Sequence, residues 1–217
     1  MRYIAQFVSL SLLIAAPVAA QDRDDGPPQP PAGSAPTLVL PPVGEDGTFD
    51  TPNHHLNPAE EVWHLRAALN VAALDCRGAG EDAIVDGYNH LLTQHAAGLA
   101  AAASRMDASY HARYGIRWEV AREHDMTKTY NFFALPPVRA EFCAIAASVL
   151  TELATVDDRD LPEFADARLR VLEAPFQNFY ARYAAYRVAL NSWRNGRQTV
   201  ALAAASPAPS APGDDGR

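Results

Sequence analysis

The stretch that decides the fold of this chain is LPEFADARLRVLEAPFQNFYARYAAYRVALNSW, residues 161–193. Its start, DLPE at 160–163, combines a capping carboxylate with a proline suited to the first turn of a helix. Pro175 is expected to bend this helix, because proline removes one backbone hydrogen bond. We call its apolar stripe the heptad seam, since large side chains recur at alternating steps of four and three residues: Leu172, Phe176, Phe179, Tyr183, Tyr186, Leu190 and Trp193.

Four further helices are predicted upstream of the heptad seam. The first begins with a capping box at 57–60 and ends before Gly78. The second, over about 82–114, is expected to be roughly 45 Å long, and the third and fourth are expected at about 117–133 and 137–155. No segment alternates convincingly with period two, so we expect no sheet. The prediction is an all-α bundle of about five helices, one of them long.

Proline-rich segments flank the predicted bundle domain, which covers residues 57–196. Residues 21–56 are dense in proline, glycine and acid and are expected to form a disordered tether, and the tail at 197–217 is expected to be disordered too.

The first twenty residues resemble a cleavable export signal. One arginine precedes an apolar run that ends in Val18-Ala19-Ala20, which predicts removal of residues 1–20. The run is short and interrupted for a membrane span, so no transmembrane anchor is expected after cleavage. The predicted location is therefore periplasmic or secreted.

Charge and motifs exclude several functional classes. The 18 basic and 26 acidic residues give a net charge of −8, which argues against a nucleic-acid partner held by phosphate contacts. The sequence has no nucleophile elbow, phosphate loop, zinc-protease helix or Cys-x-x-Cys-His haem attachment. We therefore expect no cofactor, and the chain is interpreted as a non-enzyme.

The two cysteines, Cys76 and Cys143, are predicted to form a disulfide, because both fall near inward-facing positions of predicted helices in an exported chain. A pair of buried free thiols is the alternative.

The histidines support a second functional hypothesis, a small periplasmic metal- or cofactor-dependent enzyme using His90, His95 or His124. His90 and His95 are five residues apart, whereas ligands three or four apart share a helical face. Scattered surface histidines are the simpler interpretation.

Four aromatic residues near the heptad seam form a candidate binding surface: Phe176, Tyr180, Tyr183 and Tyr186. They are interpreted first as a packed seam, in which each tyrosine hydroxyl finds a partner at the rim. The alternative is a groove for an envelope protein, a glycan or an apolar ligand.

One pattern resembles a known group of proteins. LNVAALDC at 69–76, with Tyr88-Asn89 and Tyr130-Asn131 downstream, is similar to a pattern in uncharacterised exported helical proteins of Gram-negative bacteria. The resemblance covers about residues 60–150 and implies a shared fold and a shared disulfide, but no activity. The leading hypothesis is thus an exported non-enzymatic helical protein with a binding, scaffolding or envelope-maintenance role.

Overall fold

The computed structural model describes the backbone of residues 26–205 and the side chains of residues 26–198. The predicted signal peptide at 1–20 and the end of the predicted tail at 206–217 lie outside the described residues. Within them the chain is all-α, as predicted, apart from one isolated bridge between Val43 and Phe49. The elements are α1 (Pro58–Asp75), α2 (Glu81–Gln94), α3 (Ala96–Tyr114), η1 (Gly115–Arg117), α4 (Trp118–Phe133), η2 (Pro136–Val138), α5 (Arg139–Leu153) and α6 (Leu161–Ala205).

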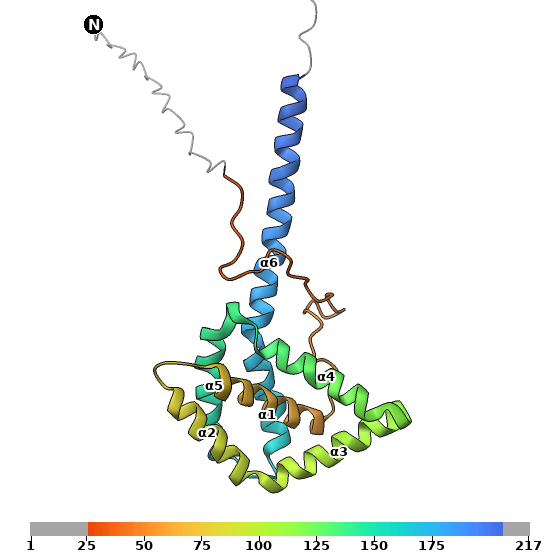
Figure 1. Cartoon of the computed structure of the whole chain (residues 1–217), viewed down its shortest axis with the longest axis vertical. Coiled ribbons are helices and arrows are strands. Elements are labelled where there is room, and N and C mark those ends of the chain that lie inside the picture. The colour runs from red at the N-terminus through yellow and green to blue at the C-terminus, as the bar shows by residue number, and fades with distance from the viewer. Residues whose placement is uncertain (1–25, 206–217) are drawn as a thin grey trace, which may run out of the picture.

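Helix α1 lies at the centre of the bundle and contacts every other α-helix (Figure 1). Its alanines Ala67, Ala68 and Ala72 are fully buried, which lets neighbouring backbones approach closely. The predicted capping box is present: the Asn57 side chain accepts the Glu60 N–H, and the Glu60 carboxylate accepts the Asn57 N–H at 3.1 Å. Local sequence therefore positions the start of the central helix.

The predicted single helix over 82–114 is instead two helices, α2 and α3, which meet at His95. The His95 side chain is 1% exposed, and its Nδ1 lies 2.7 Å from Asp158 Oδ1 in the α5–α6 connection. Gly98 fits this junction because a Cβ there would stand 3.1 Å from the Asp158 carboxylate. The break lets α2 pack on α5 while α3 packs on α1 and α4, a tertiary requirement that helical periodicity does not reveal.

The long helix of the bundle is α6, whose 45 residues span about 68 Å at 1.5 Å per residue. It continues through Pro175, which is buried within the helix; the expected bend at this proline stays a prediction. The first half of α6 contacts α1 and α5, and the second half projects beyond the bundle (Figure 1).

The core is built around phenylalanines and closed by the predicted disulfide. Cys76 and Cys143 are bonded with a Cα–Cα distance of 5.7 Å, which ties the end of α1 to α5. In the centre the Phe176 ring lies 4.4 Å from Phe132 and 5.6 Å from Phe142, measured between centroids.

Part of the predicted tether is packed against the bundle. Its described residues form no helix, but Phe49 and Thr51 are buried and Leu38 and Leu40 pack against the core. Phe49 meets Tyr180 of α6 edge-on at 5.5 Å. A few apolar side chains within a proline-rich composition are enough to dock this segment, so it is not a detached spacer from Leu38 onward.

Candidate functional site

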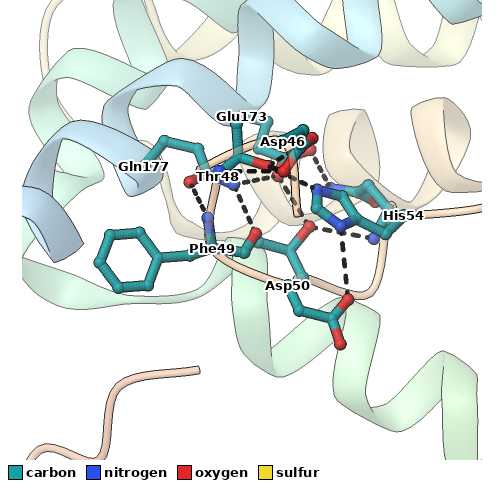
Figure 2. A network of polar contacts seen from close by, with 9 residues as sticks. Asp46, Thr48, Phe49, Asp50, His54, Glu173 and Gln177 are labelled. Carbon is teal, nitrogen blue, oxygen red and sulfur yellow. Dashed lines mark hydrogen bonds and ion pairs between the residues drawn. The ribbon is translucent and has the colours of Figure 1, made fainter. Parts of the chain in front are cut away.

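A group of five polar contacts, the clasp, fastens the N-terminal segment to α6 (Figure 2). The Phe49 N–H donates to Gln177 Oε1 at 2.9 Å, and Gln177 Nε2 donates back to the Phe49 carbonyl at 2.9 Å. The buried Glu173 carboxylate accepts from Thr51 Oγ1 at 2.7 Å, from Asn53 Nδ2 at 3.1 Å and from Gln177 Nε2 at 2.8 Å. Three donors compensate its burial, because a buried carboxylate is costly unless it is hydrogen-bonded.

We expect Gln177→Ala to lower the free energy of unfolding by about 1–3 kcal/mol, because it leaves the part-buried Phe49 N–H without its acceptor. Proteolysis within residues 38–56 should become faster as the segment detaches. Denaturant unfolding and timed digestion measure the two effects. Asn178→Ala, at the exposed neighbouring position, is the matched control, and equal behaviour of the two variants would contradict this role of the clasp.

An outer layer of the clasp shapes the turn that leads into α1 (Figure 2). Asp46 accepts from the Thr48 N–H at 3.0 Å and from Thr48 Oγ1 at 2.8 Å, and the Thr48 backbone contact lowers the pKa of Asp46. His54 lies 3.4 Å from Asp50 and 3.3 Å from Thr48 Oγ1. These contacts join side chains within residues 46–54, so their role is to stabilise the conformation of this turn.

Beneath the turn, His64 on α1 is 2% exposed, and its Nδ1 lies 3.0 Å from Asn53 Oδ1. Burial lowers the pKa of His64 to about 4, against an opposing effect of the Asp125 charge. Nearby, burial and Asp125 raise the pKa of Tyr110, whose hydroxyl donates to Asp125 Oδ2 at 3.2 Å. His64 is thus a neutral imidazole at pH 7, in contact with Asn53 of the clasp.

His64 predicts a pH dependence of stability. Its pKa is about 4 when folded and about 6.5 when unfolded, so between these values the unfolded state binds more protons. Stability contributed by neutral His64 is present above pH 6.5 and is lost as the pH falls toward 4, by up to about 3 kcal/mol. Urea unfolding across this range should show a steeper loss for the natural chain than for His64→Gln. Parallel curves would contradict the assignment.

A groove of about 720 Å³ lies between residues 30–39 and the part of α6 that leaves the bundle. Tyr183, Tyr186 and Leu190 contribute apolar surface to it, and Arg187 and Arg194 contribute positive charge. The Tyr183 hydroxyl donates to the Ala35 carbonyl at 3.4 Å, which closes the groove at the bundle end.

The candidate binding surface is divided by the structure. Phe176, Tyr180 and Tyr183 are 0%, 7% and 4% exposed. Phe176 and Tyr180 belong to the core, and Tyr183 is buried at the bundle end of the groove, against Ala35. Tyr186 is partly exposed and lines the groove, as Leu190 does further along α6. The packed interpretation therefore describes the bundle half of the heptad seam, and the surface interpretation applies only from Tyr186 onward.

Sequence reasoning missed the charge distribution along α6. Residues 174–205, which are 32 of the 45 residues of α6, contain no aspartate or glutamate in a chain of net charge −8. Among the residues that the structure describes, none of the arginines in this stretch forms an ion pair with a carboxylate: Arg182, Arg187, Arg194 and Arg197. Seven of the ten described arginines that precede this stretch are paired with a carboxylate, as in Arg77–Glu81, Arg122–Asp107 and Arg168–Glu152. The sequence feature that could have revealed this distribution is the absence of aspartate and glutamate between Glu173 and the end of α6.

The histidines of the enzyme hypothesis are not brought together as metal ligands. His90 on α2 and His124 on α4 are exposed, and buried His95 is bound to Asp158. Within residues 26–198, no group of three or more His, Cys, Asp or Glu side chains could hold a metal ion.

Among the described residues, no single helix is long and apolar enough to cross a membrane. The segments Ala96–Phe133 and Pro136–Leu153, which meet at an angle of 46°, reach the required length and hydropathy only when taken together.

No protein-family model, curated protein or solved structure matches this chain. The resemblance to exported helical proteins of Gram-negative bacteria stays a prediction.

Proposed function

We propose that this chain is an exported, non-enzymatic binding protein whose bundle holds the C-terminal part of α6, from Tyr186 onward, out for a partner. One observation carries the proposal: a helix of 45 residues uses only its first half to build the bundle. The second half keeps partly exposed Tyr186, Leu190 and Trp193 along the heptad seam. Tyrosine, tryptophan and arginine are the residues most enriched at the centres of protein interfaces.

Two features support a rigid scaffold outside the cytoplasm. The Cys76–Cys143 disulfide is compatible with a periplasmic or extracellular location. The Tyr183 hydroxyl donates to the Ala35 carbonyl and Leu38 packs against the core, which holds the N-terminal wall of the groove in place. A partner would therefore meet a groove that is already formed.

Site-specific photocrosslinking in intact cells tests the binding role. A photoreactive amino acid at Leu190 should yield a discrete adduct of higher mass, because this position lines the groove. The same amino acid at Ala144, an exposed position on α5, is the matched control. No adduct at Leu190, or identical adducts at both positions, would contradict the proposal.

Export predicts a defined mature chain. Protein recovered from the periplasm or medium should begin at Gln21, because the basic start, apolar run and small residues of 1–20 suit signal peptidase. Intact mass spectrometry measures this directly. Recovery of a membrane-held chain that still begins at Met1 would contradict it.

A further inference from the structure

We propose that the partner is an acidic amphipathic helix, which pairs with α6 between Tyr186 and Arg197 as a heteromeric coiled coil. This inference rests on the proposed binding function and names the chemical class of the partner.

The first step is the continuity of the heptad seam. Within the bundle, Phe176 and Phe179 of the seam are part of the core, and Tyr183 is buried beside Phe179 and the Ala35 carbonyl. Beyond it, Tyr186, Leu190 and Trp193 keep the same steps of four and three residues, although they are only partly covered. Sustained 3.5-residue periodicity is the pattern that packs knobs into holes of a second helix. The projecting half of α6 therefore has the spacing that a helical partner requires.

The second step is the position of the arginines relative to the heptad seam. Arg187 and Arg194 directly follow Tyr186 and Trp193, and Arg182 directly precedes Tyr183. With Tyr183 and Leu190 at heptad position a and Tyr186 and Trp193 at position d, Arg182 lies at position g and the other two arginines lie at position e. Charges at these two positions, which flank the seam, set partner choice in coiled coils.

The third step is the sign of the flanking charge. All three flanking arginines are exposed, and none has a carboxylate partner among the described residues. With no acid from residue 174 to residue 205, only another molecule or a distant part of the chain can neutralise them. A partner helix with glutamate or aspartate at its own flanking positions supplies that charge.

A symmetric pair of α6 helices is disfavoured by the same charges. In a parallel pair of two copies, Arg182 of each helix would face Arg187 of the other, and like charges across a coiled coil repel. Arg197 occupies a seam position itself and lies over the Trp193 ring at 5.0 Å, which adds a further cation to the would-be interface. The occupant is therefore a different, acidic chain.

A membrane surface fits the helix less well. Helices that lie in the membrane interface separate an apolar face from a strongly charged opposite face. Here the arginines flank the heptad seam, and the opposite face carries uncharged Val188 and Ser192. The arrangement favours a polypeptide that offers apolar and acidic groups side by side.

The test uses a designed peptide of four heptads with isoleucine at a, leucine at d and glutamate at e and g. The control peptide carries lysine at e and g. Fluorescence anisotropy with the full mature chain should show binding of the glutamate peptide and not of the lysine peptide. Binding should weaken as salt is raised, because the pairs are exposed.

Charge reversal gives the matched variants. Arg187→Glu with Arg194→Glu should weaken binding of the glutamate peptide about tenfold or more and create binding of the lysine peptide. Arg105→Glu with Arg117→Glu makes the same charge change at exposed positions outside α6 and should alter neither. Circular dichroism and melting curves should be unchanged in both, since all four side chains are exposed.

Each other outcome overturns the inference. No binding of the glutamate peptide by the folded chain excludes an acidic helix, and so does binding that charge reversal leaves unchanged. Binding to vesicles of anionic phospholipid, lost on charge reversal, without peptide binding would assign the surface to lipid. Self-association lost on charge reversal would assign it to a second copy. A discrete crosslink at Leu190 that persists after charge reversal would leave the binding function standing and remove only the acidic partner.

Discussion

Phe176→Ala is expected to lower the free energy of unfolding by about 3–5 kcal/mol, the range for removing a fully buried aromatic ring. The Phe176 side chain is 0% exposed, and its ring centroid lies 4.4 to 5.7 Å from those of Phe132, Phe133 and Phe142. These rings come from α4, α5 and α6, so the cavity cannot close without moving three helices. Thermal unfolding should show a fall of about 6 to 20 °C in Tm for a chain of this size.

Tyr186→Ala is the matched control, three helical turns further along the heptad seam. Tyr186 is partly exposed, so its truncation should cost no more than about 1 kcal/mol. The contrast separates the core half of the seam from its surface half. Similar losses for the two variants would mean that the seam is packed along its whole length, and the groove would lose its role.

Loss of the disulfide is expected to have an effect of similar size. Cys76 and Cys143 are 67 residues apart in sequence, and closing such a loop stabilises the folded state by about 4 kcal/mol in the chain-entropy model. The bond also joins the end of α1, the helix that contacts every other α-helix, to α5. Reductant should therefore lower the Tm of the natural chain markedly, as measured by calorimetry.

The double variant Cys76→Ala, Cys143→Ala supplies the control for this measurement. It should melt close to the reduced natural chain and should not respond to reductant. Thiol labelling of the natural chain under denaturing, non-reducing conditions should detect no free cysteine. Labelling of both residues, or an unchanged Tm after reduction, would show that the bond contributes nothing in solution.

Local signals made much of the fold predictable. The capping box at Asn57 and the heptad seam of α6 depend on contacts within one or two turns, so sequence periodicity and capping chemistry reveal them. The pairing of Cys76 with Cys143 was also predictable, because the chain has two cysteines and each therefore has one available partner. The division at His95 was not, since it depends on Asp158, which lies 63 residues away in sequence.

The candidate site was predictable only in part. Sequence reasoning identified the aromatic residues near the heptad seam. It could not show that Phe176 and Tyr183 are buried whereas Tyr186 is partly exposed in the groove. That division depends on where the bundle ends along α6, which is a property of how all the helices pack. The sequence shows that residues 174–205 contain arginines and no acids. Only the structure shows that these arginines are unpaired, whereas most described arginines elsewhere have a carboxylate partner.

By itself, the sequence determined the helical class, the start of α1, the disulfide partners and the face of α6 that carries apolar side chains. Each of these follows from chemistry between near neighbours or from the small number of available partners. Tertiary structure alone decided the bend at His95, the docking of residues 38–56 and the exposure of each residue on the heptad seam. These depend on contacts such as Phe49 with Gln177, 128 residues apart, whose free energy exists only once distant helices have come together.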